Sequence, residues 1–167
     1  MGMYSIFLEQ ERNKSEKLLH NIMPKSIAEK LKNNIKTISM DNPEISVLFA
    51  DIVSFTEMSE KISSEKIVGF LNDMFSQFDD LTETYGVEKI KTIGDSYMVV
   101  SGMPVQKEDH ALTLFNLAKE MIKISAQFKD HNGNPIKLRI GINSGPAISG
   151  VIGKSKFAFD VWGDTIN

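Results

Sequence analysis

The stretch that decides the fold is Val87–Val100, which reads VEKIKTIGDSYMVV. Two runs of strand-forming residues flank the pair Gly94-Asp95, and such a pair is typical of a two-residue hairpin turn. A further apolar run, ISVLFAD over Ile45–Asp51, ends in a second aspartate. If these runs form neighbouring strands, Asp51 and Asp95 meet at one edge of a sheet. Two carboxylates in that position suit a divalent metal carrying a nucleoside triphosphate, which indicates phosphoryl chemistry.

Composition is that of an ordinary globular chain of 167 residues, 41% hydrophobic and 25% charged. This length suits one domain with a real core and an appendage. The formal net charge of −3 argues against a general binder of nucleic acid or anionic membranes. The absence of cysteine excludes disulfides and thiolate zinc sites. No run approaches the ~20 apolar residues of a membrane span.

The N-terminal region, residues 1–43, is polar and carries apolar residues at helical spacing: Leu18, Leu19, Ile22, Ile27 and Leu31. We expect a helix that Pro24 interrupts, because proline cannot continue the hydrogen-bond ladder. Two interpretations stay open. The region is either a solvated amphipathic arm or a signalling (transducer) helix that pairs with a partner copy and links to an upstream module.

From Glu44 the pattern predicts alternating strands and helices. After the strand that ends at Asp51, the predicted elements are a short helix from Ser54, a helix from Ser63 or Ser64 to Gly86, the hairpin, a helix over 107–129 and a strand over 136–142. This order is that of the ferredoxin-like split βαββαβ fold, an α+β class with an antiparallel sheet and helices on one face. Residues 144–164 predict one or two extra C-terminal strands.

The candidate metal ligands are the two aspartates. Each alone is commonly just a turn or cap residue, and only their pairing raises a functional interpretation. Two close carboxylates repel unless a cation bridges them, and Mg²⁺ or Mn²⁺ is the natural bridge. Two such ions would suit an in-line displacement, one activating a hydroxyl and one neutralising phosphates.

Backbone amides after Asp51 form the candidate phosphate site. A helix begins near Ser54, so the N–H groups of Ser54, Phe55 and Thr56 are free to face a phosphate. Gly153-Lys154-Ser155 ends like a P-loop, but Ile148 stands where its leading glycine belongs. We therefore assign the glycine-rich run 144–153 to close backbone packing and turns.

Two charged residues in apolar strands are candidates for reading a purine base. Lys91 alternates with apolar residues, and Asp160 lies between Phe159 and Val161. Such residues are often at solvent-facing or edge positions. A lysine donor and an aspartate acceptor can instead pair with the ring nitrogens and amino group of adenine. Lys89 is a weaker candidate for the lysine role.

From Glu44 to Asn167 the chain resembles the class III nucleotidyl cyclases, the adenylate and guanylate cyclase family. The resemblance is carried by four motifs and by a segment like the transducing helix that precedes these domains. They are VLFADI with Phe55-Thr56, KIKTIGDSYM over 89–98, RIGI over 139–142 with Ser144-Gly145, FDVWGDTIN over 159–167, and LLHNIMP over 18–24.

The resemblance implies that a 3′-hydroxyl of ATP attacks the α-phosphate and releases pyrophosphate, giving cyclic AMP. In the family pattern Asp51 and Asp95 hold two metal ions with the Ile52 carbonyl, and the amides of 54–56 hold the terminal phosphates. Lys91 and Asp160 select adenine, where guanylate cyclases carry a glutamate and a small residue. Asn167 is the catalytic residue that orients the ribose or the phosphate.

The resemblance also implies head-to-tail homodimers with sites shared between chains, the metal aspartates from one and Lys91, Asp160 and Asn167 from the other. Family members carry an arginine and a lysine beyond this asparagine. We therefore expect residues 44–167 to be a C-terminally incomplete catalytic domain, weakly active or inactive by itself. The alternatives are a non-catalytic nucleotide-binding or dimerisation module and a guanylate cyclase. We expect a cytoplasmic domain, and leave open an upstream sensor and a membrane anchor in the parent protein.

Overall fold

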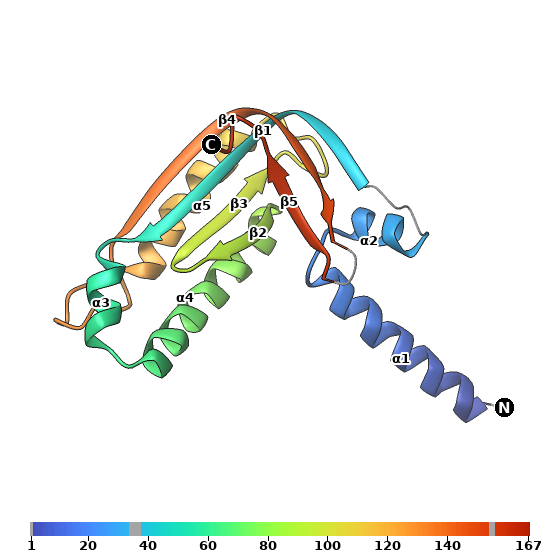
Figure 1. The fold of residues 1–167 in the computed structure, drawn as a ribbon, viewed down its shortest axis with the longest axis horizontal. Coiled ribbons are helices and arrows are strands. Elements are labelled where there is room, and N and C mark those ends of the chain that lie inside the picture. Colours follow the sequence, from blue (N-terminus) through green and yellow to red (C-terminus); the bar gives the residue numbers. More distant parts are fainter. Residues whose placement is uncertain (1, 34–37, 154–155) are drawn as a thin grey trace. The chain divides into compact units, whose positions relative to one another are not determined.

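A computed structural model describes residues 2–33, 38–153 and 156–167 (Figure 1). The chain divides into two compact units, one of residues up to 41 with 148–161 and one of residues 42–147 with 162–167. The helices are α1 (Gly2–His20), α2 (Lys25–Lys32), α3 (Phe55–Lys61), α4 (Ser64–Tyr85) and α5 (His110–Ser125). The strands are β1 (Ile38–Ile52), β2 (Glu88–Ile93), β3 (Ser96–Ser101), β4 (Leu138–Ile152) and β5 (Ala158–Trp162).

The sheet confirms the predicted fold class. Its strand order is β2-β3-β1-β4-β5, and β3 runs antiparallel to both β1 and β2. The first four strands have the order of the ferredoxin-like split βαββαβ arrangement, with β5 as the extra C-terminal strand. β1 and β3 therefore lie side by side inside the sheet, as the pairing of the two aspartates requires.

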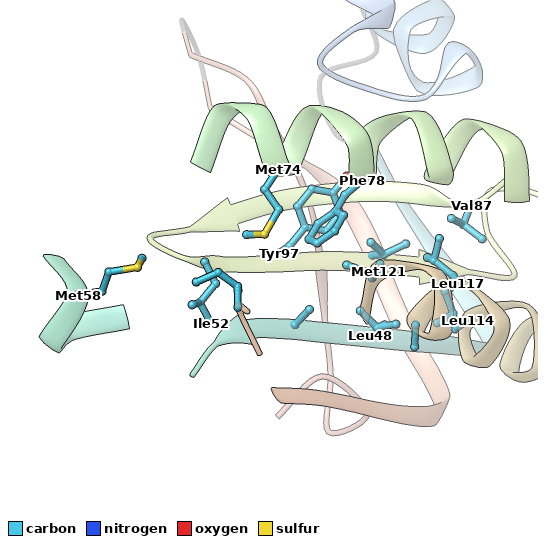
Figure 2. Close-up of a cluster of buried hydrophobic side chains, with 14 residues drawn as sticks. Leu48, Ile52, Met58, Met74, Phe78, Val87, Tyr97, Leu114, Leu117 and Met121 are labelled. Atoms are coloured by element: carbon cyan, nitrogen blue, oxygen red, sulfur yellow. The ribbon is translucent and has the colours of Figure 1, made fainter. Parts of the chain in front are cut away.

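One apolar core joins α3, α4 and α5 to this sheet. Alternate residues of β1 and β3 contribute Leu48, Ala50, Ile52, Tyr97 and Val99, all nearly inaccessible to solvent. The helices contribute Met58 from α3, Met74 and Phe78 from α4, and Leu114, Leu117 and Met121 from α5 (Figure 2). Since side chains alternate between the faces of a strand, the other residues of β1 and β3 point to the opposite face.

Three boundaries differ from the predicted ones. β1 begins at Ile38 instead of near Glu44. It contains Pro43, which has no N–H to donate, and the side chain of the preceding residue, Asn42, donates to the Ala147 carbonyl of β4 instead. α5 spans only His110–Ser125, because the chain on either side of it forms turns. β4 is one strand of 15 residues that continues through the glycine-rich run predicted as separate short strands.

The N-terminal region is helical and interrupted as predicted. Pro24 is the N-cap of α2, and the amine of Lys32 lies 2.9 Å from Glu16 of α1. Ile27 and Ala28 of α2 are buried. Among the described residues, no helix combines the length and the hydropathy that a membrane crossing demands. Whether this region transmits a signal stays a prediction, as does the domain boundary at residue 43.

Glycines of the run 144–153 serve close packing. A Cβ at Gly150 would lie 2.5 Å from the carbonyl oxygen of Ile38, and one at Gly145 would lie 2.6 Å from Oγ1 of Thr165. Real Cβ atoms do not approach other heavy atoms so closely, so these positions admit only glycine unless the Ile38 main chain or the Thr165 side chain shifts. This agrees with the interpretation of the run as backbone packing.

We therefore expect Gly150→Ala to lower the free energy of unfolding by about 2 kcal/mol, because β1 and β4 must move apart to admit the methyl group. Gly141→Ala is the matched control on the same strand, since a Cβ there meets nothing within 4 Å. Urea denaturation of both variants measures the difference. Equal midpoints would show that the contact between Gly150 and Ile38 does not constrain the strands.

Candidate active site

Asp51 lies at the end of β1 on the face away from the core helices. The register pairs Ala50 with Tyr97, and both of these side chains belong to the helix-side core. Asp51 is the next residue along β1, so its side chain points to the opposite face. Its carboxylate is half-buried, with 39% of the side chain exposed.

Asp95 lies at the apex of the β2–β3 hairpin, as predicted. Ile93 pairs with Ser96, which leaves Gly94 and Asp95 as a two-residue turn, and Gly94 has a φ of +59°. The backbone N–H of Ile52 donates to Oδ2 of Asp95 at 3.0 Å. Ile52 is the neighbour of Asp51, so this bond holds the hairpin carboxylate at the end of β1. The structure thus brings the two predicted ligands and Ile52 together.

The donor set fits a divalent cation. Oδ1 of Asp51 is buried and has no hydrogen-bond partner among the described residues. A buried carboxylate oxygen without a donor is rare, and an ion or an ordered water at this atom would satisfy it. In the described part of the chain no group of three or more His, Cys, Asp and Glu side chains gathers at one point. The two carboxylates of Asp51 and Asp95 suit Mg²⁺ or Mn²⁺. Such ions commonly bind one or two carboxylates and complete their coordination shell with substrate phosphates and water.

The predicted phosphate site lies at the start of α3. Ser54 is its N-cap in the left-handed conformation, with a φ of 61°, which is uncommon for a residue with a side chain. The Ser54 carbonyl accepts from Met58 at 3.1 Å, while the amides of the first turn have no acceptor within the helix. The N–H of Val53 donates to the Lys137 carbonyl at 2.9 Å and ties this turn to the chain before β4. Ser54 lines an open cleft of about 360 Å³ together with Val53, Asp130, Asn134, Pro135, Ile136 and Lys137.

A β-bulge separates the two candidate lysines. Lys89 pairs with Val99 and Lys91 with Met98, and the register shifts between them. Lys89 therefore lies on the helix side, with its amine 2.7 Å from Asp79 and 5.0 Å from the centre of the Tyr97 ring. Lys91 lies on the face that carries Asp51. The structure gives Lys89 a structural role, and the base-reading role of Lys91 stays a prediction.

Asp160 and Asn167 are the remaining predicted residues. Asp160 lies in β5, half-buried, and its Oδ1 accepts from the N–H of Val161 at 2.8 Å. Asn167 follows a turn in which its N–H donates to Gly163 at 3.3 Å. Two bonds fix that turn on β4: Thr165 donates to the Pro146 carbonyl at 2.7 Å, and Asn143 donates to the Thr165 carbonyl at 3.0 Å. The roles of both residues stay predictions.

Sequence reasoning assigned no role to Arg139, which the structure places at the site. Its Nη1 atom lies 3.7 Å from Oδ2 of Asp51. Leu138 and Ile140 on either side pack against the helix-side core, so Arg139 points to the face of Asp51. The sequence did hold a signal, namely an arginine alternating with apolar residues in a predicted strand.

Comparison with known proteins identifies the class. The family model of the adenylate and guanylate cyclase catalytic domain matches residues 37–167. An adenylate cyclase of Mycobacterium tuberculosis is 48% identical over 161 residues, which make up 96% of this chain and 36% of that protein. The chain therefore spans about a third of the length of this curated relative.

Solved structures give the same class. The catalytic core of a rhodopsin–guanylyl cyclase with converted specificity, in complex with ATPαS, is 37% identical with a TM-score of 0.72, over 77% of this chain and 70% of that one. A non-canonical dimeric guanylyl cyclase domain of the RhoGC fusion protein from Blastocladiella emersonii is 36% identical with a TM-score of 0.71, over 77% and 72% of the two chains. The chain belongs to the adenylate and guanylate cyclase catalytic domain family.

The buried hydroxyl of Tyr97, on β3 of the hairpin, makes the stability of the fold depend on pH. The Tyr97 hydroxyl donates to Asp79, which also binds Lys89. Burial, and then the bond to Asp79, raises the pKa of Tyr97 far above its usual value near 10. The folded state thus keeps this phenol protonated while the unfolded chain ionises it above about pH 10.

We expect Tyr97→Phe to lower the free energy of unfolding at pH 7 by about 1 kcal/mol, through the lost hydrogen bond. Above pH 10 the contribution of Tyr97 to stability falls as pH rises, because the unfolded chain releases the phenol proton and the folded state keeps it. The difference in free energy of unfolding between wild type and variant therefore narrows by up to ~1.4 kcal/mol per pH unit. Urea denaturation between pH 7 and pH 11 measures it, with Tyr85→Phe as control. A difference that stays constant with pH would contradict this account.

Proposed function

We propose that this chain is the catalytic domain of an adenylate cyclase, which converts ATP to 3′,5′-cyclic AMP and pyrophosphate. The observation that carries the proposal is the bond from the Ile52 N–H to Asp95, which holds two carboxylates at the ends of adjacent strands. The 48% identity to a mycobacterial adenylate cyclase supports the same assignment.

In the proposed reaction the 3′-hydroxyl of ATP loses its proton to solvent water, its oxygen bonds to the α-phosphorus, and the bond from that phosphorus to the pyrophosphate oxygen breaks. Asp51, Asp95 and the carbonyl of Ile52 would hold two Mg²⁺ or Mn²⁺ ions, which supply charge neutralisation and activation of the hydroxyl when bound. The amides of Ser54, Phe55 and Thr56 would bind the terminal phosphates at the start of α3. Asn167 would orient the ribose or the α-phosphate.

Preference for adenine is the finer part of the proposal. Lys91 would donate to a ring nitrogen of adenine and Asp160 would accept from its amino group. Support comes from the lysine and the aspartate themselves, where guanylate cyclases carry a glutamate and a small residue. A guanylate cyclase is the second candidate, because one solved relative above is a guanylyl cyclase domain by name, while the other is the core of a rhodopsin–guanylyl cyclase whose specificity has been converted.

We further propose that two copies of the chain share each site, with the aspartates from one copy and Lys91, Asp160 and Asn167 from the other. This assembly follows the family pattern, and a guanylyl cyclase domain 36% identical to the chain is described as dimeric. Since Lys91 and Asp95 lie on one hairpin, each hairpin would serve two different sites. A single copy would then lack half of each site.

The direct test is to incubate the chain, and a form of the parent protein extending past Asn167, with ATP or GTP and Mn²⁺. We expect cyclic AMP from the extended form, at a rate at least ~10²-fold above that of the chain ending at Asn167, if a preorganised electrostatic contact lies beyond it. Asp51→Ala in the extended form should abolish product, with Gly141→Ala as a folded control. Nucleotide binding without turnover in the extended form would favour a non-catalytic module.

The base preference has its own test in the extended form. Lys91→Glu combined with Asp160→Ser should move the ratio of kcat/KM for ATP over GTP by at least tenfold toward GTP, because the donor and the acceptor for adenine are both removed. Lys119→Gln on α5, an exposed position, is the control with the same change in net charge, −1. An unchanged ratio would remove Lys91 and Asp160 from base selection without affecting the metal site.

A further inference from the structure

Three polar side chains from β1, α5 and β4 meet at one end of the helix-side core. The hydroxyl oxygen of Ser46 lies 2.6 Å from Nδ1 of His110 and 2.5 Å from Oγ of Ser144. Ser46 and His110 are both buried. We call these three residues the serine–histidine relay. They belong to none of the groups assigned to metal, phosphate or base.

We propose that His110 is a positioning residue. Through Ser46 and Ser144 it holds the part of β4 that carries the turn before Asn167, and so places Asn167 for the proposed reaction. This inference rests on the proposed function, since that function gives Asn167 its role. It gives α5, otherwise a packing helix, a part in arranging the site.

Ser144 lies between the two residues of β4 that hold this turn. On one side of it, Asn143 donates to the Thr165 carbonyl at 3.0 Å. On the other side, the Pro146 carbonyl accepts from the Thr165 hydroxyl at 2.7 Å. The bond from β1 to Ser144 therefore fixes the stretch of β4 on which the Asn167 turn rests.

Glu44 sets the direction of the hydrogen bonds in the relay. Its carboxylate lies 3.7 Å from Nε2 of His110, which favours the ring proton on Nε2 and leaves Nδ1 as an acceptor. The Ser46 hydroxyl then donates to Nδ1, and the Ser46 oxygen accepts from the Ser144 hydroxyl. Because each group has a defined role, a Ser144 displaced along the strand would lose its acceptor.

Stability alone does not explain polar residues at these positions. Ser46 continues the row of alternate β1 residues Leu48, Ala50 and Ile52 that fill the core, where an aliphatic side chain would be buried without any polar group to satisfy. Ser101, which pairs with Ser46 across the sheet, has a buried Oγ that finds no partner in the part of the chain that the structure describes. Hydrogen bonds are directional and apolar contacts are not, so a polar cluster here defines the placement of β4 more exactly than apolar packing would.

The test replaces the relay by apolar side chains, with Ser46→Ala, His110→Leu and Ser144→Ala combined in the extended form of the parent protein. We expect a urea midpoint near that of the wild type, because polar partners are removed together. Hydrogen exchange of the turn 163–167, followed by mass spectrometry, should become at least ~tenfold faster. The kcat for cyclic AMP should fall about tenfold or more with KM for ATP nearly unchanged. Ser125→Ala, which removes another buried hydroxyl of α5, is the matched control.

His110→Asn tests the hydrogen bond itself, because the amide oxygen of asparagine can accept from Ser46 in place of Nδ1. This variant should resemble the wild type in exchange and turnover more closely than His110→Leu does. Equal losses in the two single variants, or unchanged exchange of the turn in the apolar variant, would overturn the relay. A lower urea midpoint with faster exchange across the whole sheet would show a purely structural cluster and would overturn it as well.

The exchange measurement needs no catalysis, which separates this inference from the proposed function. If the wild-type extended form binds nucleotide without turnover, the proposed function fails, while the exchange rates still decide whether His110 holds the turn. If the wild type converts ATP and the apolar variant has the same kcat, the positioning role fails and the proposed function stands.

Discussion

The hydrogen bond from the Ile52 N–H to the Asp95 carboxylate is the contact on which the site depends. It joins the apex of a hairpin to the end of the neighbouring strand. Without it, a two-residue turn at the edge of the sheet would be free to twist away from β1. The bond also uses one oxygen of Asp95 and one backbone donor beside Asp51. It therefore holds the Asp95 carboxylate at the end of β1 against the repulsion that Asp51 exerts on it.

The sheet has two faces with different tasks. One face packs against α3, α4 and α5 and supplies the stability of the fold. The other carries Asp51, Lys91 and Arg139, so the charged residues do not interrupt the core. The bulge between Lys89 and Lys91 maintains this division, because it sends the first lysine to the helix side and the second to the face of Asp51. On the helix side the amine of Lys89 contacts the carboxylate of Asp79 and lies over the ring of Tyr97.

Much of this could be predicted from the sequence. Strand periodicity, the Gly-Asp turn and the helix signals at Ser63 and Gly86 give the element order, and that order gives the fold. Sequence could not predict the bulge, because a register shift depends on pairing with β3 and not on the residues of β2 alone. It could not predict the length of β4 either, since glycines that punctuate a sequence here serve close contact with Ile38 and Thr165. Arg139 escaped notice because its partner is nearly ninety positions away in the chain.

β4 sets the register of both ends of the candidate site. Near its start Arg139 faces Asp51, and further along Asn143 and the Pro146 carbonyl hold the turn that leads to Asn167. Side chains alternate along a strand, so a slip of one residue would send Arg139 toward the core and leave a buried guanidinium without a partner. The same slip would separate Thr165 from Pro146. The slip would also replace Gly145 with a neighbour that carries a side chain, and that side chain would collide with Thr165. The glycines of β4 therefore define where the site residues lie, although none of them takes part in the chemistry.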